Sequence, residues 1–456
     1  MLRLRWLKHE LKLAIAGMLV VGAAAALPNS ATAQIATGVG LVNRQVGGVA
    51  IDAEGVLSNI DPVARKELGE LRKKALAGVP VDLDDKTELR MVSLRLLDQH
   101  LQKLRTENKP LTDDVRYLAG LQRVRYIFLD PANQDIVLAG PAEGWKSDAL
   151  GNVVGETTGQ PVLHLDDLLV ALRSADQARN GGISCSINPT EEGRARLNQV
   201  MSTKRTIGNP QQTFAEYENA LGLQTITVGG VPGDSHFARV LVAADYRMKR
   251  LAMQLDPSPI HGLVNNLDKA LARVNGSPRW WLSPNYEALQ KDPEGLAWEL
   301  SGVGVKCLTE EDTFADDGKQ TGTVKATPAA QRWADIFTAK YADLAAKEPV
   351  FAELRNCIDL AVIAALIQKE DFQKQASCQL GALLSNAETP IEKYNVPTKV
   401  AAKASAVKKG RNWIIATSGG VMIQPWEMIQ EAKKSDTVAT VRTKAVTARQ
   451  GNWYWD

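Results

Sequence analysis

Apolar and polar residues are patterned most clearly over residues 224–256. The β-branched run 225–228 predicts a strand. The Gly/Pro-rich segment 229–233 ends that strand, because glycine permits unusual dihedrals and proline lacks an amide donor. Ser235 then predicts a helix start, since its oxygen can accept from a first-turn amide. The apolar residues that follow recur at helical spacing as far as Pro257. They are Phe237, Val240, Leu241, Ala244, Met248, Leu251 and Leu255.

The remaining patterns predict an α+β chain that is organised around this strand and helix. Residues 34–119 are expected to form a hairpin and a helical N-terminal region, with one amphipathic helix over 84–105. Residues 120–275 alternate hairpin, helix and strand patterns, which predicts a mixed α/β layer domain.

The C-terminal part of the chain changes character. Residues 276–388 predict a small β-meander and a C-terminal helical hairpin, separated by a polar loop over 314–327. Residues 389–456 predict a Lys/Ala-rich linker and a small αβ segment, in which the Thr/Val-rich stretch 437–442 indicates a strand. The aromatic end of the chain is expected to dock on the body.

The first 33 residues have the pattern of an export signal. A basic stretch precedes the apolar run 13–27, and the small residues 31–33 fit a cleavage site before Gln34. The apolar run is shorter than the roughly 20 residues that a membrane-spanning helix needs. We therefore expect a secreted or periplasmic protein with no transmembrane anchor after signal cleavage.

Charge excludes one class of partner. The whole chain has 54 basic and 52 acidic residues, and the predicted signal holds four basic and one acidic residue, which leaves 50 and 51. A chain so close to neutral does not have the basic balance of a nucleic-acid binder. The sequence thus predicts no nucleic-acid partner, and it leaves self-association or an envelope component as the possible partners.

Four cysteines remain after the signal: Cys185, Cys307, Cys357 and Cys378. In an exported protein an even number permits disulfides, and Cys357 with Cys378 is the candidate pair because they lie on neighbouring helical segments. The alternative is four buried thiols. No CxxC motif occurs, which disfavours a structural zinc site or a thioredoxin-like redox site.

Ser235 is the one candidate nucleophile. Residues 233–235 resemble the Gly-Asp-Ser block of SGNH esterases, but that family's distal Asp-x-x-His pair has no match at any histidine here. A nucleophilic serine needs a base within hydrogen-bond reach, and adjacent residues on a helix do not face one another. The sequence therefore favours a helix cap at Ser235, and the catalytic residues are unknown.

Metal and cofactor chemistry has little support in the sequence. His164 and Asp166 form a His-x-Asp pair, but Asp166 is explained as a helix cap and the histidines do not cluster along the chain. The glycine-rich loop 140–161 lacks the spacing of a phosphate-binding loop. We predict no metal site and no cofactor.

Aromatic residues gather in the predicted meander. Trp280, Trp281 and Trp298 could stack on sugar rings if they were exposed, and they are the candidate binding residues. If they are buried, they belong to the core of the meander, because alternation places half of such side chains inside.

Several stretches resemble a family of exported planctomycete proteins that carry a domain of unknown function (DUF1598). These are GDSHFARVLVAADYRMKRLAM, RWWLSPNYEALQKDPEGLAWELSGVGVKCLTE, FTAKYADLAAKEPVFAELRNCIDLAVIAALI and VRYIFLDPANQDIVLAGPAEGW. The resemblance covers about residues 110–370. It implies export and no known activity, and it assigns no catalytic residue.

The functional prediction is an exported, non-enzymatic protein of the cell envelope that acts by binding or as a structural component. One alternative is a hydrolase that uses Ser235 or a carboxylate. The other is a glycan-binding module built on the three tryptophans.

Overall fold

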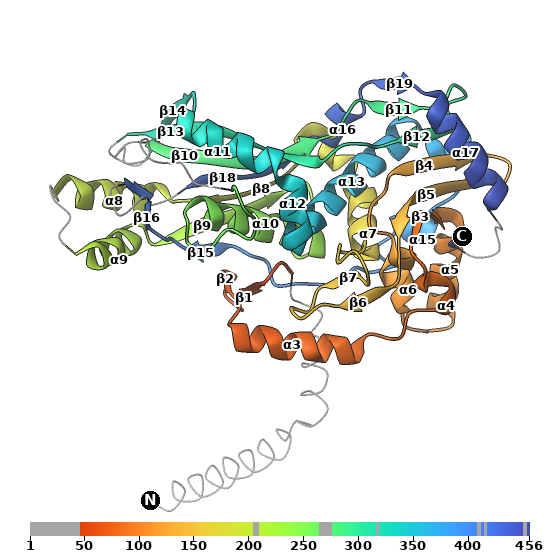
Figure 1. Ribbon diagram of the computed structural model, residues 1–456, viewed down its shortest axis with the longest axis horizontal. Helices are drawn as coiled ribbons and strands as arrows, with labels where there is room; N and C mark the ends of the chain where they lie inside the picture. The colour runs from red at the N-terminus through yellow and green to blue at the C-terminus, as the bar shows by residue number, and fades with distance from the viewer. Residues whose placement is uncertain are drawn as a thin grey trace, which may run out of the picture. The chain divides into compact units, whose positions relative to one another are not determined.

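A computed structural model describes residues 46–203, 209–263, 276–315, 319–407, 412–414, 417–449 and 454–456. The predicted export signal lies outside these residues. Residues 45–456 form one compact unit, and the fold given below is that of this unit (Figure 1). Its helices and mixed sheets confirm the predicted α+β class.

The larger sheet has nine strands among the described residues, in the order β1-β2-β15-β9-β8-β18-β10-β13-β14. Most neighbours are antiparallel, while β15–β2 and β10–β18 are parallel. The strand bounds, in this order, are Val49–Ile51, Val56–Asn59, Lys399–Ala401, Leu223–Gly229, Ile183–Asn188, Ser418–Ile423, Gly276–Asn285, Gly304–Phe314 and Gln320–Val324. Each of the four segments predicted between residues 34 and 456 contributes strands, and that division of the chain stays a prediction.

The smaller sheet has the order β19-β11-β12-β4-β5-β3. Its strands are Ala432–Lys434, Leu289–Lys291, Ala297–Glu299, Tyr126–Asp130, Asp135–Ala142 and Thr87–Ser93. The C-terminal residue extends this sheet, because the backbones of Asp456 and Met91 exchange two hydrogen bonds. Two short antiparallel strand pairs belong to neither of these sheets. They are β6 (Trp145–Ser147) with β7 (Val153–Gly155), and β16 (Ser405–Val407) with β17 (Asn412–Ile414).

Three helices form the centre of the core: α7 (Leu165–Ser174), α10 (His236–Ala252) and α13 (Pro349–Lys369). Each of them packs on the other two. Figure 1 shows α7 and α13 between the larger and the smaller sheet. Because α13 is buried on nearly every side, its polar residues meet other protein groups rather than water.

The other helices surround this centre. They are α3 (Pro62–Ala75), α4 (Val81–Asp84), α5 (Leu94–Thr106), α6 (Asp113–Arg116), α8 (Glu191–Thr203), α9 (Pro210–Leu221), α11 (Pro328–Ala339), α12 (Tyr341–Lys347), α14 (Phe372–Gln375), α15 (Gly381–Leu384), α16 (Pro425–Met428) and α17 (Asp436–Ala448). Short 3-10 turns cover Leu118–Gly120 and Gln177–Asn180. Among the described helices, none combines the length and the apolar character that crossing a bilayer requires.

The prediction for the central stretch is confirmed. β9 runs over the β-branched residues, α10 begins at His236, and Ser235 is its N-cap. The apolar positions of α10 from Phe237 to Met248 are fully buried. Local propensity, capping and apolar spacing agree here, which is why the sequence alone was sufficient to predict this strand and helix.

The strand predicted over 437–442 is wrong, because this stretch lies in α17. The Thr/Val composition favoured a strand, but Val438, Val441 and Ala445 recur at helical spacing and pack against the smaller sheet. Packing of that stripe overrides β-propensity, which depends strongly on context.

Two further expectations need correction. The helix predicted over 84–105 is divided into β3 and α5, because Ser93 caps a helix that starts only at Leu94. The polar loop predicted over 314–327 contains β14, which pairs with β13 as an edge strand. An edge strand can be polar because one of its sides has no neighbouring strand.

Candidate metal centre

The Ser235 side chain caps helix α10 and is not arranged as a catalytic nucleophile. Its side chain is buried, its Oγ donates to the Pro232 carbonyl oxygen at 2.6 Å, and it accepts from the Ala238 amide at 3.1 Å. The hydroxyl proton is therefore committed to a carbonyl and not to a histidine. The capping prediction is confirmed.

The residue after this cap forms the most notable polar contact of the core. His236 Nδ1 lies 3.0 and 2.9 Å from the two carboxylate oxygens of Asp167, although the residues are 69 positions apart in sequence. Only 6% of His236 and 5% of Asp167 is exposed. Burial opposes the charged imidazolium, but the charge and the hydrogen bond of Asp167 outweigh it and raise the pKa of His236.

His164 lies directly over this pair. Its ring stacks on that of His236 with centroids 4.4 Å apart and planes 13° apart. Burial, and then the positive charges of His236 and Arg72, hold the pKa of His164 well below its ordinary value. Within the described residues the His164 ring makes no hydrogen bond, so its nitrogen lone pairs are available to a ligand.

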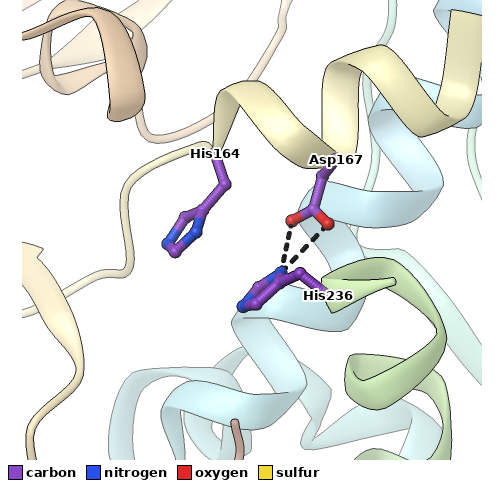
Figure 2. Close-up of side chains that lie close together, drawn as sticks. All are labelled: His164, Asp167 and His236. Atoms are coloured by element: carbon purple, nitrogen blue, oxygen red, sulfur yellow. Dashed lines mark hydrogen bonds and ion pairs between the residues drawn. The ribbon is translucent and has the colours of Figure 1, made fainter. Parts of the chain in front are cut away.

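The fold brings these side chains together through two helix starts. His164 is the N-cap residue of α7 and Asp167 lies in its first turn, while His236 is the first residue of α10. Figure 2 shows the Asp167 carboxylate pointing at the His236 ring, with His164 beside them. We call His164, Asp167 and His236 the metal centre.

Helix α13 packs on α7 and α10 and carries two buried ionisable groups, Cys357 and Glu353. Burial raises the pKa of the Cys357 thiol well above its ordinary value, and the negative charge of Asp167 acts in the same direction. Glu353 lies one turn earlier, is 8% exposed, and has one carboxylate oxygen, Oε2, without a hydrogen-bond partner among the described residues. Burial raises the pKa of Glu353 to about 7, although His236 acts in the opposite direction.

The donor set fits a transition-metal ion. One ligand atom from each residue of the metal centre can be chosen so that all three lie within 4.8 Å of one another. In a tetrahedral site zinc lies about 2.0–2.2 Å from nitrogen and oxygen ligands, which places two ligand atoms of one ion roughly 3.3–3.6 Å apart. Ligand atoms at the 4.8 Å limit would have to approach each other by roughly 1.2–1.5 Å.

Ring orientation sets one requirement. Imidazole lone pairs lie in the ring plane, so two stacked rings reach one ion only when one of them turns. His236 is held by Asp167, whereas His164 is partly exposed and has no side-chain hydrogen bond within the described residues. His164 is therefore the ring that can turn.

A loop segment covers the other side of His236. The Tyr394 ring lies 6.0 Å from the His236 ring, and the Arg239 guanidinium lies over Tyr394 at 5.2 Å. The Tyr394 amide donates to the Asp234 carbonyl oxygen at 2.8 Å, beside the start of α10. His164, with intermediate exposure, is the least buried of the three residues.

The structure also contains a small hollow of about 30 Å³ that is lined in part by Lys249, Arg250 and Gln224. Lys249 donates to Asp245 and to the carbonyl oxygens of Ile187 and Gly419, which uses its three donors. This hollow has no histidine or cysteine in its lining, so the metal centre is the stronger candidate.

The three candidate tryptophans do not form one surface. Trp280 and Trp298 are buried, where they pack on Trp333 and Phe372, and only Trp281 is partly exposed. Trp280 and Trp281 are neighbours in β10 and so point to opposite faces of the sheet. The three rings therefore cannot stack together on a sugar.

The candidate disulfide is not formed. Cys185, Cys307, Cys357 and Cys378 are all buried free thiols. Cys357 lies on α13, while Cys378 follows α14, and both side chains belong to the buried core. The alternative of four buried thiols describes the structure.

The fold and site together define an α+β protein with a buried His–Asp pair at the meeting point of three helices. Residues 185–266 match the family model described as a protein of unknown function (DUF1598). No curated protein and no solved structure matches the chain. The matched segment includes His236 but neither His164 nor Asp167, and the expected planctomycete origin stays a prediction.

Sequence reasoning did not bring His164, Asp167 and His236 together because it searched for histidines that are close along the chain. The available signal was the position of each histidine at a predicted helix start. Two helix starts can meet in space however far apart they are in sequence.

Proposed function

We propose that this chain is an exported protein that binds a divalent transition-metal ion at the metal centre. The observation that carries the proposal is the convergence of two imidazoles and one carboxylate, with ligand atoms within 4.8 Å. Imidazole ligands suit zinc, copper, nickel and iron, whereas magnesium and calcium prefer oxygen ligands.

The charges of the metal centre support this proposal. Burial lowers the pKa of His236, but the charge and the hydrogen bond of Asp167 outweigh it, so a positive charge is favoured beside the buried carboxylate. A metal ion needs neutral imidazole and ionised carboxylate ligands, so its binding would compete with protonation of His236. A bound metal ion would therefore supply the positive charge that is favoured beside the buried Asp167 carboxylate.

Titration of Zn²⁺ into the metal-free full chain, followed by calorimetry, tests the proposal. We expect one ion per chain and an affinity at least about tenfold lower in His164→Gln and in His236→Gln, because each removes a ligand. His261→Gln is the matched control, since this exposed histidine lies in a loop away from the metal centre. Absence of zinc binding, or equal affinity in His236→Gln, would refute it.

Export is a separate part of the proposal and rests on the pattern of residues 1–33. Processing before Gln34 is its direct test: N-terminal sequencing of protein from an expressing Gram-negative host should begin at Gln34, in the periplasmic or secreted fraction. An intact N-terminus in the cytoplasm would contradict export.

We propose a non-enzymatic role in the cell envelope for the metal-loaded protein. The commitment of the Ser235 hydroxyl to the helix cap supports this over a serine hydrolase. Purified protein should bind an envelope fraction or associate with itself in sedimentation experiments. Failure of both tests would leave the metal centre standing but remove the envelope role.

A further inference from the structure

A segment without helix or strand is hydrogen-bonded to the starts of both α7 and α10. It comprises residues 392–395, which lie between α15 and β15 and which we call the strap. The Glu392 amide donates to the Asp166 carboxylate, in the first turn of α7, at 3.3 Å. The Tyr394 amide donates to the Asp234 carbonyl oxygen, just before α10, at 2.8 Å. The strap therefore ties together the two helix starts that carry the metal centre.

The Tyr394 side chain packs beside the metal centre. Only 7% of this residue is exposed, and its ring lies 6.0 Å from that of His236. The Arg239 guanidinium lies over the Tyr394 ring at 5.2 Å and also donates to the Asn395 carbonyl oxygen at 3.2 Å. Movement of the His236 ring is therefore limited by Tyr394 as well as by its hydrogen bond with Asp167.

The residues that the strap holds are close neighbours of the proposed ligands. Asp166 directly precedes Asp167, and Asp234 lies two residues before His236. Ligands from two different helices reach one ion only while the helix starts keep their spacing. Contacts that orient ligands from outside the coordination sphere raise metal affinity, because the ligands then need less ordering when the ion binds.

We propose that the strap positions the ligands of the metal centre and slows the release of the bound ion. This inference rests on the proposed function. While the strap is attached, the starts of α7 and α10 keep their spacing and the His236 ring keeps its orientation. When it detaches, both constraints are lost and the ion leaves more easily. By linkage, an ion that is bound more tightly with the strap attached must itself favour the attached strap.

Transfer of zinc from the loaded full chain to an excess of chelator measures the release rate. In Tyr394→Ala we expect release at least about tenfold faster than in the wild type, because the missing ring no longer limits the movement of His236. Tyr394→Phe keeps the ring and should release zinc at nearly the wild-type rate.

A second pair of variants tests the bond between the strap and α7. Asp166→Ala removes the acceptor of the Glu392 amide, whereas Asp166→Asn removes the same charge but keeps an oxygen that can accept from this amide. We expect faster zinc release in Asp166→Ala than in Asp166→Asn. A purely electrostatic action of Asp166 on the metal centre would change both variants alike. If Tyr394→Ala does not fold, this pair decides.

Tyr217→Ala is the matched control. Tyr217 is also a buried tyrosine, 4% exposed, but it packs in a separate cluster with Leu197 and Leu221. We expect this variant to be less stable than the wild type in urea unfolding and to release zinc at the wild-type rate. Urea unfolding of the other variants establishes that each one is folded.

Hydrogen exchange gives a readout on the strap itself. The amides of Glu392 and Tyr394 should exchange more slowly in the zinc-loaded chain than in the metal-free chain. Equal exchange in both states, or equal release from the wild type and folded Asp166→Ala, would overturn the strap, as would release that is just as fast in Tyr217→Ala as in Tyr394→Ala. In each case the wild type still binds zinc, so the proposed function survives. If the wild type binds no zinc, the proposed function itself fails and the inference fails with it.

Discussion

Replacing Glu353 with glutamine should make the metal-free protein more stable at alkaline pH. Glutamine has nearly the volume of glutamate but no charge, so it removes the buried carboxylate without opening a cavity. Glu353 is 8% exposed and its Oε2 has no hydrogen-bond partner within the described residues. The change therefore isolates the cost of burying the charge.

The pKa of Glu353 gives the size of this effect. Burial is the first cause of its rise from 4.5 to about 7. Each pKa unit corresponds to about 1.4 kcal/mol, so the folded state disfavours the charged form by about 3 kcal/mol. Because the folded-state pKa is the higher one, the wild type loses this stability as pH rises from about 4.5 through about 7.

Urea unfolding of both chains at pH 5 and pH 8.5, with a chelator present, measures the difference. We expect similar free energies of unfolding at pH 5, and a variant more stable than the wild type by about 3 kcal/mol at pH 8.5. The raised pKa of His236 also makes stability fall with rising pH, and because the charge of Glu353 is one cause of that rise, the variant loses part of this contribution too. Equal pH dependence in the two chains would refute the reasoning.

Three further predictions follow from buried contacts. Asp167→Asn should cost about 3–5 kcal/mol of unfolding free energy, because it leaves His236 without its charged partner; a loss below 1 kcal/mol in urea unfolding would contradict the ion pair. Ser235→Ala should cost about 1 kcal/mol through the lost cap and leave zinc affinity unchanged in calorimetry; a loss of zinc binding in the folded variant would place Ser235 in the metal centre. Val438→Ala should cost about 2 kcal/mol because Val438 is fully buried on the inner face of α17, whereas Val446→Ala, at a residue 53% exposed, should cost less than about 0.5 kcal/mol; equal costs in thermal unfolding would contradict the packing of this helix.

Elements with agreeing local signals were predictable from the sequence. In α10, the cap at Ser235 and the apolar spacing from Phe237 onward point to the same helix, and the structure has it. In α17 the β-branched composition and the spacing of Val438, Val441 and Ala445 disagree, and the spacing decides because burial is worth more than propensity. Reading that spacing first would have predicted the helix.

The metal centre could not be predicted in the same way. Nothing local to His164 or His236 says that α7 and α10 start side by side, because their contact depends on how both helices pack on α13. The buried tryptophans show the same limit: the sequence places Trp280 and Trp298 on strands, but only the packed core decides which face is covered. Pairing of distant elements is a property of the whole fold.

X-ray absorption at the zinc edge of the zinc-loaded full chain tests the central claim most directly. The account predicts four nitrogen or oxygen neighbours and outer-shell scattering from two imidazoles, which drops to one imidazole in His236→Gln. A chain that retains no zinc after desalting, or a spectrum with sulfur neighbours or without imidazole scattering, would contradict it.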